Sequence, residues 1–194
     1  MRPTGFSPLI LALACLLAAT PCSWAQTPDA GLKLEVTRQN GRFRAIASFQ
    51  TPLSVCQAFE SLASHDTTKH LQGVTASKMT RTAPNKVLVE RWGSESILLV
   101  KVKVHTLLEY TEYPPNRMEF VQLAGDMKSY TGSWEIVPED GGTRLKYEST
   151  LEPDSLVPGF IIQHFVTDRL RKRLLDGIEY MTAHPPAPSA TCGT

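Results

Sequence analysis

The segment from Gly73 to Pro153 constrains the fold of this chain most strongly, because apolar and polar residues alternate along it with a period of two. Such alternation is typical of β-strands that bury one face and expose the other to water. Turn-forming sequences interrupt it at Ala83-Pro84-Asn85, Tyr113-Pro114-Pro115-Asn116, Gly125-Asp126 and Glu139-Asp140-Gly141-Gly142. Alternating segments joined by short turns predict an antiparallel meander.

The clearest strand of this meander lies at Leu98 to Tyr110, where valines alternate with lysines between Val100 and Lys103. One face of this strand is therefore apolar and the other is solvated. On the two strands that follow Asp126, the residues expected to share one face are Tyr130, Gly132, Trp134, Ile136, Leu145, Tyr147 and Leu151. A sheet with one solvent-exposed face needs another element to cover its apolar face.

The segment from Gly159 to Met181 is predicted to be this covering helix. Its apolar residues recur at helical spacing, at Val166, Leu170, Leu174, Ile178 and Met181. The basic residues at positions 169 and 171–173 lie mainly off this stripe. We interpret them as a solvated helix face, with transient contact to a membrane or to an anionic partner as the alternative.

Two alternating segments precede the meander, Leu32 to Val36 and Phe43 to Phe49. They flank the turn sequence Asn40-Gly41, which predicts either a hairpin or one long bent strand. A short helix is expected to begin at Thr51-Pro52, because proline is favoured in the first turn of a helix. A second short helix is expected near Thr67 to Leu71.

The first 25 residues have the pattern of a cleaved signal peptide. Arg2 provides a short positive region, Leu9 to Ala19 is an uninterrupted apolar run, and Ser23-Trp24-Ala25 is a small-residue cleavage site. The apolar run is much shorter than the roughly 20 residues that span a bilayer, so cleavage after Ala25 is favoured over a permanent anchor. The mature protein is therefore expected to be periplasmic or secreted.

Removal of this leader leaves two of the four cysteines, Cys56 on the first predicted helix and Cys192 in a Pro-rich tail. Export permits a disulfide between them, and a core thiol with a separate tail thiol is the alternative. The two cysteines do not have the spacing of metal ligands, so a zinc or iron–sulfur site has no support. No cofactor and no metal are predicted.

The chain of 194 residues is predicted to hold one domain at 32–182, between the signal peptide at 1–25 and a flexible Pro-rich tail at 183–194. Without the leader, which contains Arg2 as its one charged residue, Lys plus Arg falls from 20 to 19 and equals the 19 Asp plus Glu residues. A neutral domain argues against nucleic acid as a partner, because phosphate binding needs a basic excess or a basic face. The oligomeric state is left open by the sequence.

Two motifs resemble a known family. The first runs from Gly125 to Pro138 (GDMKSYTGSWEIVP) and continues from Gly141 to Tyr147 (GGTRLKY), and the second is Pro158-Gly159-Phe160. Together with the order of elements, they resemble the START-like superfamily, also called the polyketide cyclase/dehydrase and lipid-transport group, over roughly Leu32 to Met181. The most similar branch includes the coenzyme Q-binding START-like proteins, although this sequence differs from the quinone-associated members in carrying a signal peptide.

The resemblance implies an α+β helix-grip fold. In this fold a curved antiparallel sheet of about six to seven strands wraps around a long C-terminal helix, with two short helices after the first strand. The ligands that the resemblance implies are lipids, quinones and other apolar small molecules. Its motifs identify a scaffold more specifically than a reaction.

A sheet that grips one helix leaves a tapering cavity between the two, lined by inward-facing side chains. The residues predicted to line it and to bind an apolar ligand are Trp92, Val102, Val104, Tyr110, Phe120, Tyr130, Trp134, Tyr147, Phe160, Phe165 and Leu170. Tyr130 and Trp134 are the strongest candidates, because Gly132 lies between them on the same predicted face and leaves room in the cavity. Ordinary core packing is the alternative at each position.

A catalytic role would need an acid/base pair, a nucleophile or a metal set in the cavity. Of the five histidines, His164 is the one expected near the cavity mouth, whereas His65 is assigned a capping or surface role and His105 the outer face. Glu90 shares strand parity with Trp92 and is expected to point inward as a lone carboxylate. No catalytic residue is therefore predicted.

The favoured function is periplasmic binding or transfer of a hydrophobic small molecule, such as a lipid, a quinone or a polyketide-like compound. A cyclase or dehydratase that uses the same cavity is the main alternative, and a protein-interaction module is the third. A carrier needs only apolar walls, whereas an enzyme needs a polar cluster inside the cavity.

Overall fold

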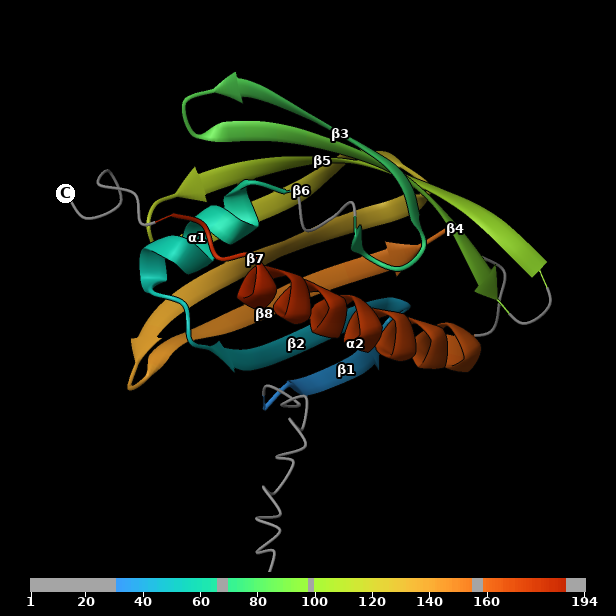
Figure 1. Ribbon diagram of the computed structural model, residues 1–194. Helices are drawn as coiled ribbons and strands as arrows, with labels where there is room; N and C mark the ends of the chain where they lie inside the picture. The colour runs from blue at the N-terminus through green and yellow to red at the C-terminus, as the bar shows by residue number, and fades with distance from the viewer. Residues whose placement is uncertain (1–30, 66–69, 98–99, 155–158, 188–194) are drawn as a thin grey trace, which may run out of the picture.

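The computed structural model describes residues 31–65, 70–97, 100–154 and 159–187, with the backbone alone at 95–97, 100, 161 and 165. These ranges form one antiparallel sheet of eight strands, a short helix and a long helix (Figure 1). The strands are β1 (Lys33–Gln39), β2 (Arg42–Thr51), β3 (Val74–Ala83), β4 (Lys86–Ile97), β5 (Val100–Tyr113), β6 (Arg117–Gly125), β7 (Met127–Glu139) and β8 (Gly142–Pro153). The helices are α1 (Val55–Ala63) and α2 (Gly159–Ala183). The sheet curves around α2, as the helix-grip expectation requires.

The strand order is β1-β2-β8-β7-β6-β5-β4-β3, so the last strand lies beside the second. The register of β2 and β8 runs from Phe43 opposite Leu151 to Thr51 opposite Thr143. This pairing joins the N-terminal strands to the meander from β3 to β8. A continuous sheet results, with α1 packed against β7 and β8 and α2 against β1 and β2.

The turn between β1 and β2 shows that the N-terminal segments form a hairpin and not one bent strand. Asn40 and Gly41 have positive φ angles of 50° and 78°, and Gln39 pairs directly with Arg42. A two-residue turn with positive φ at both positions matches the twist of the flanking strands, which explains the Asn-Gly sequence.

The faces of the central strands follow the alternation in the sequence. On the face toward α2, the buried residues of β2 and β8 are Phe43, Ala45, Ala47, Phe49, Thr51, Thr143, Leu145, Tyr147 and Ser149. Thr143 is the most deeply placed polar residue of this set, and its Oγ1 donates a hydrogen bond of 2.7 Å to the carbonyl oxygen of Leu53. Its burial therefore leaves no unpaired hydroxyl.

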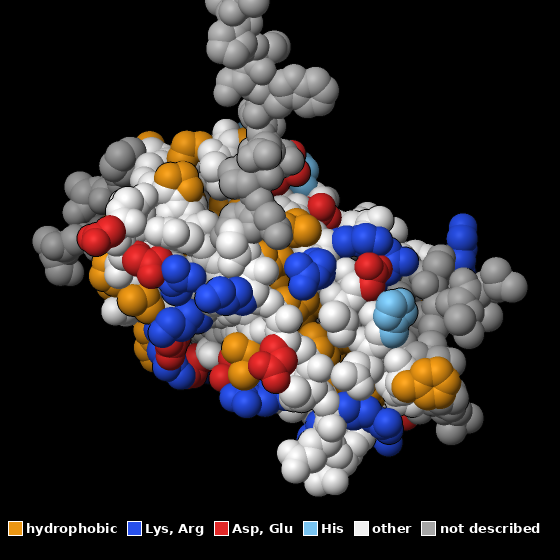
Figure 2. Space-filling view, turned by 90° about the horizontal axis from the view of Figure 1, so that it is seen from below, with side chains coloured by type: hydrophobic (Ala, Val, Ile, Leu, Met, Phe, Trp, Pro, Cys, Tyr) orange, Lys and Arg blue, Asp and Glu red, His pale blue; other side chains and the backbone are white. Residues whose placement is uncertain are grey.

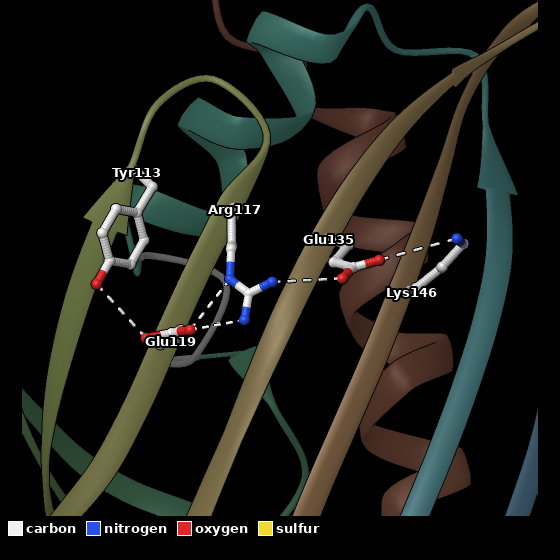
Figure 3. A network of polar contacts seen from close by, with 5 residues as sticks. All are labelled: Tyr113, Arg117, Glu119, Glu135 and Lys146. Carbon is white, nitrogen blue, oxygen red and sulfur yellow. Dashed lines mark hydrogen bonds and ion pairs between the residues drawn. The ribbon is translucent and has the colours of Figure 1, made fainter.

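The opposite face of the sheet is solvated and carries ion pairs within and between strands. Arg117 Nη2 on β6 lies 2.6 Å from Glu119 Oε1, and Arg117 Nη1 lies 3.5 Å from Glu135 Oε1 on β7. Lys146 Nζ on β8 lies 3.8 Å from the other carboxylate oxygen of Glu135. Figure 3 shows this row, which also includes Tyr113, with α2 on the far side of the sheet. Exposed pairs of this kind contribute only about 0–1 kcal/mol each to folding stability. Their main effect is that this face of the sheet is polar and solvent-exposed.

Helix α1 begins with a capping box. Ser54 Oγ accepts a hydrogen bond from the backbone N–H of Gln57, and Gln57 Oε1 accepts one from the backbone N–H of Ser54, at 3.3 and 3.1 Å. The helix therefore starts at Val55 and not at Thr51-Pro52 as predicted. The reason is that Thr51 still belongs to β2, where it pairs with Thr143.

Cys56 on α1 is disulfide-bonded, so the alternative of a free core thiol is wrong for this residue. Since Cys56 is the one cysteine in the described ranges, its partner lies outside them. The neighbouring Gln57 donates from Nε2 to the carbonyl oxygen of Pro186 at 3.1 Å. This bond places the chain that follows α2 beside α1.

Helix α2 confirms the predicted covering helix and extends to Ala183. Its buried apolar residues are Ile162, Leu174, Ile178 and Met181, with Val166 and Leu170 half-buried. Near its start, Gln163 Nε2 donates to the carbonyl oxygen of Val36 at 3.2 Å, which ties the helix to β1. Neither helix in the described ranges has the length and apolar character needed to cross a membrane. On the face of the molecule seen in Figure 2, basic and acidic side chains are interspersed.

The structure differs from the prediction in the number of strands, because the N-terminal segments contribute two strands and the meander contributes six. Of the two short helices, α1 is observed. The second, expected near residues 67–71, falls mainly on 66–69, outside the described residues. The predicted signal peptide and most of the predicted tail also lie outside them.

Candidate functional site

A cavity of about 210 Å³ lies between the inner face of the sheet, the end of α1 and the C-terminal half of α2. Its wall draws on strands β2 to β8, so residues far apart in the sequence meet there. The apolar side chains of the wall include Phe49 from β2, Met118 from β6 and Ile178 from α2. The sheet and the helix diverge enough at this point to leave space that no side chain fills.

Five aromatic side chains form a continuous cluster on the sheet side of the cavity. Trp134 meets Phe49 edge to face with ring centroids 6.3 Å apart, and it lies 4.7 Å from Tyr147. Phe120 meets Tyr130 edge to face at 5.0 Å and stacks with Tyr147 at 6.3 Å. Contacts in this distance range hold aromatic rings in defined orientations. The cluster therefore gives the cavity a rigid apolar wall.

Polar groups enter this wall at a few points. The hydroxyl oxygens of Tyr130 and Tyr147 are 2.9 Å apart and share a hydrogen bond. Burial raises the pKa of both phenols, that of Tyr147 well above its ordinary value. Both hydroxyls therefore stay neutral at physiological pH and can donate a hydrogen bond.

Arg91 on β4 brings a positive charge to the cavity. Its Nη2 donates to the hydroxyl oxygen of Tyr110 at 3.1 Å, and its guanidinium carbon lies 5.8 Å from the centre of the Tyr110 ring. Arg173 on α2 also contributes to the wall, and its Nε donates to the carbonyl oxygen of Gln72 at 3.3 Å. The described residues of the wall include no aspartate and no glutamate.

Eight of the residues predicted to line the cavity are in its wall: Trp92, Val104, Tyr110, Phe120, Tyr130, Trp134, Tyr147 and Leu170. Their role in ligand binding stays a prediction. The side chain of Phe165 lies outside the described part of the structure.

Two of the predicted lining residues are elsewhere. Phe160 is 72% exposed, because it belongs to the first turn of α2, about 15 Å along the helix axis from Leu170. Val102 is 37% exposed, because it lies two residues beyond Val104 toward the β4–β5 turn.

The space above Gly132 is not open, contrary to the prediction. Gly132 pairs with Phe120 across β6 and β7, and a side chain at position 132 would meet the ring of Phe120 and the carbonyl oxygen of Glu148. An aromatic ring therefore covers the glycine, a recognised way to protect a glycine within a sheet. The glycine makes room for Phe120 and not directly for a ligand.

The two faces of β4 are assigned differently from the prediction. Val87, Val89 and Arg91 share the buried face, since they pair with buried residues of β5. Glu90 and the ring of Trp92 occupy the other face, together with His105. Glu90 Oε1 lies 2.9 Å from His105 Nε2, and the Trp92 ring stacks on His105 at 5.5 Å. Glu90 is thus not an inward-facing carboxylate, and Trp92 only borders the cavity.

Sequence reasoning missed His65, Arg91 and Arg173. His65 is buried, with 5% exposure, and its ring meets Tyr110 at 4.6 Å, whereas His164 is exposed and is absent from the described wall. The parity of Val87 and Val89 could have identified Arg91. Arg173 lies at the edge of the apolar stripe next to Leu174, and His65 left no signal in the local pattern.

The chemistry that this wall offers is hydrogen bonding and charge complementarity. In the described ranges, no group of three or more His, Cys, Asp and Glu side chains is arranged to hold a metal ion. The wall side chains that could exchange a proton or donate a hydrogen bond are His65, Arg91, Trp92, Thr106, Tyr110, Tyr130, Trp134, Tyr147 and Arg173.

Comparison with solved structures shows similar folds at low sequence identity. A protein of Thermus thermophilus is 20% identical with a TM-score of 0.62, over 72% of this chain and 97% of that protein. The STAR-related lipid transfer protein of Xanthomonas axonopodis is 11% identical with a TM-score of 0.61, over 78% and 98%. The Zhui aromatase/cyclase of a Streptomyces species is 9% identical with a TM-score of 0.59, over 73% and 92%.

The sequence itself identifies the family. Among curated proteins, none matches this chain significantly. The family model described as polyketide cyclase / dehydrase and lipid transport matches residues 53–179, which run from just before α1 into the last turns of α2 and so contain nearly all of the cavity wall. This chain therefore belongs to the polyketide cyclase/dehydrase and lipid-transport family.

Proposed function

We propose that this protein binds a hydrophobic small molecule in the cavity between the sheet and α2, and carries it in the periplasm. The observation that carries the proposal is a cavity of about 210 Å³ whose wall is mainly aromatic and aliphatic. Binding sites for small molecules are typically concave and apolar with a few polar groups that orient the ligand. The wall described above has this composition.

The similar proteins support the same class of ligand. The family description names lipid transport, and the Xanthomonas axonopodis structure is called a lipid transfer protein. A quinone-type ligand, as in the coenzyme Q-binding branch that the motifs resemble, falls within this proposal.

A second candidate function is a cyclase or dehydratase that uses the same cavity. The observation that favours it is the presence of Arg91, Tyr110 and the Tyr130–Tyr147 pair in the wall. Groups of this kind could polarise a carbonyl oxygen of a bound polyketide-like compound. Turnover of such a compound by the purified protein would favour the enzyme over the carrier.

The direct test is native mass spectrometry of protein purified gently from the periplasm of a bacterial host. We expect a population heavier than the polypeptide by the mass of one small molecule, which is lost on organic extraction. The extracted protein should then bind a neutral apolar fluorescent probe with saturation at one site. Absence of both a copurified molecule and saturable probe binding would contradict the proposed function.

Export is the second part of the proposal. We expect the mature chain to begin at Gln26 or within a few residues of it, because Ser23-Trp24-Ala25 forms the cleavage site of the leader. N-terminal sequencing of the periplasmic protein measures this directly. As a control, replacing Ser23 and Ala25 together with arginine should block cleavage. Soluble wild-type protein that retains Met1 would contradict the prediction.

Trp134 allows ligand binding to be observed and weakened at the same residue. Once the leader is removed, Trp92 and Trp134 are the two remaining tryptophans, so Trp92→Phe leaves Trp134 as a single reporter. We expect its fluorescence to shift when an apolar probe binds. Trp134→Ala should weaken binding about tenfold or more, because a large aromatic contact is lost.

The stability of the Trp134→Ala variant must be measured in parallel, since truncating a core aromatic residue costs about 3–5 kcal/mol. Circular dichroism establishes whether the variant is folded under the binding conditions. Unchanged probe affinity in a folded variant would remove Trp134 from the site.

A further inference from the structure

The charged side chains of the cavity wall are all basic where the structure describes it. Arg91 from β4 and Arg173 from α2 both contribute to the wall, and the described residues of the wall contain no carboxylate. The nearest acidic side chain on β4, Glu90, is on the opposite face of the sheet and is hydrogen-bonded to His105. A cationic ligand would therefore meet repulsion in this cavity, and an anionic ligand would meet attraction.

Arg91 also retains an unused hydrogen-bond donor. Its Nη2 donates to the hydroxyl oxygen of Tyr110, whereas its Nε is buried and has no hydrogen-bond partner within the described part of the chain. Buried donors are nearly always paired, and an unpaired donor on a charged group is costly. A guanidinium edge with a free donor is well suited to a carboxylate, because its N–H groups match the two oxygens.

The surroundings of Arg91 differ from the rest of the cavity. Thr106 is its cross-strand neighbour on β5. Tyr110, which accepts a hydrogen bond from Arg91, packs against His65 with the ring centroids 4.6 Å apart. Phe49 and Trp134 lie in the part of the wall formed by β2 and β7, with Met118 on β6. The cavity is therefore amphipathic, because Arg91, Thr106 and Tyr110 form a polar region at β4 and β5. The hydroxyls of Tyr130 and Tyr147 on β7 and β8 are hydrogen-bonded to each other, and the rings around them are apolar.

The volume limits the size of the ligand. At about 210 Å³, the cavity is below the roughly 300–1,000 Å³ that is common for sites of drug-sized ligands. A molecule with one short acyl chain or one or two rings suits this space better than a two-chain phospholipid.

We propose that the ligand of this cavity is an amphipathic acid, with a single apolar body and one carboxylate that accepts hydrogen bonds from the Arg91 guanidinium. This inference rests on the proposed binding function and specifies its ligand class. The Arg91 Nε becomes paired when the acid binds, and the apolar body of the acid contacts the aromatic cluster. The carboxylate compensates the positive charge of Arg91, which a neutral alcohol cannot do.

The test compares three probes that differ only in the head group: decanoate, 1-decanol and decylammonium. Their affinities for the extracted protein are measured at pH 8 by displacement of a neutral apolar fluorescent probe. We expect decanoate to bind about tenfold to a hundredfold more tightly than 1-decanol, as for hydrogen bonds to charged groups, and decylammonium to bind most weakly.

The variants identify the residue responsible. Arg91→Leu should abolish the preference for decanoate over 1-decanol, since the lost interaction is charge-assisted. Arg91→Lys keeps the charge without the planar donor pair and should retain part of the preference, which also provides a second variant if Arg91→Leu fails to fold. Arg171→Leu, at an exposed position of α2 outside the described wall, is the matched control and should behave as wild type.

The outcomes separate the two proposals. Equal affinity of the wild-type protein for decanoate and 1-decanol would overturn the amphipathic-acid inference while leaving hydrophobic binding intact. A preference for decanoate that survives in folded Arg91→Leu would overturn the assignment to Arg91. Failure of all three probes, together with the absence of any copurified molecule, would overturn the proposed function itself.

Discussion

Replacing Gly132 with valine is expected to lower the free energy of unfolding by on the order of 3 kcal/mol, the upper end of the range for overpacking a core. A side chain at this position would overlap the ring of Phe120 and the carbonyl oxygen of Glu148. The ring could move into the cavity, but the carbonyl oxygen belongs to β8 and is held by the pairing of β7 with β8. The strain is therefore not relieved by a side-chain rotation alone.

Urea unfolding followed by circular dichroism measures this loss. Thr131→Val is the matched control, because Thr131 is the exposed neighbour on the same strand and valine keeps its branched shape. The control should change stability by less than about 0.5 kcal/mol, as is usual for surface substitutions. A Gly132→Val variant with stability close to that of the control would contradict the packing of Phe120 over Gly132.

The same variant should also weaken ligand binding if it remains folded. Phe120 contacts Tyr130 and Tyr147 in the aromatic cluster, so a displaced ring would enter the cavity volume. Titration of the folded variant with the neutral apolar probe measures this effect. Gly132 would thus influence the site through the position of Phe120.

Replacing Cys192 with serine is expected to lower the free energy of unfolding by about 2–4 kcal/mol, the typical contribution of a disulfide that closes a long loop. Cys56 is disulfide-bonded, and if the leader is removed as proposed, Cys192 is the one other cysteine that remains in the sequence. The hydrogen bond from Gln57 to Pro186 places the start of the tail beside α1. We therefore predict a Cys56–Cys192 bridge.

Two measurements test the bridge. Alkylation followed by peptide mass spectrometry without reduction should recover Cys56 and Cys192 in one cross-linked peptide pair. Cys56→Ser, Cys192→Ser and the double variant should lose the same stability, because each removes the same bond. A stability loss in Cys56→Ser without one in Cys192→Ser would assign the effect to packing of α1.

The bridge also bears on the proposed export. Structural disulfides persist in oxidising compartments such as the periplasm and are rare in the cytosol. Protein expressed without residues 1–25 in a reducing cytosol should therefore show free thiols and the lower stability of the serine variants. Its oxidation after purification should restore the wild-type value.

Local alternation determined much of the sheet before any contact was known. Every second residue is buried from Phe43 to Thr51 in β2 and from Thr143 to Ser149 in β8, since a strand must point successive side chains to opposite faces. The Asn40-Gly41 turn and the apolar stripe of α2 likewise depend on residues that are close along the chain. Which face of a strand is buried depends more on residues distant in the sequence, as β4 shows. Arg91 follows Val87 and Val89 onto the inner face, whereas the larger apolar Trp92 stacks on His105 outside.

The sequence by itself determined the hydrophobic periods of the strands and helix, the turns and the family motifs, because each depends on residues that are close along the chain. Tertiary structure alone decided the burial of His65 and the exposure of Phe160, and it decided that Arg91, which shares strand parity with Val87 and Val89, and Arg173 reach a cavity. Burial depends on which distant element covers a residue, and a charged side chain enters an apolar wall only where neighbours such as Tyr110 stabilise it. The cavity exists because α2 crosses the curved sheet without filling it, and no local pattern encodes that separation.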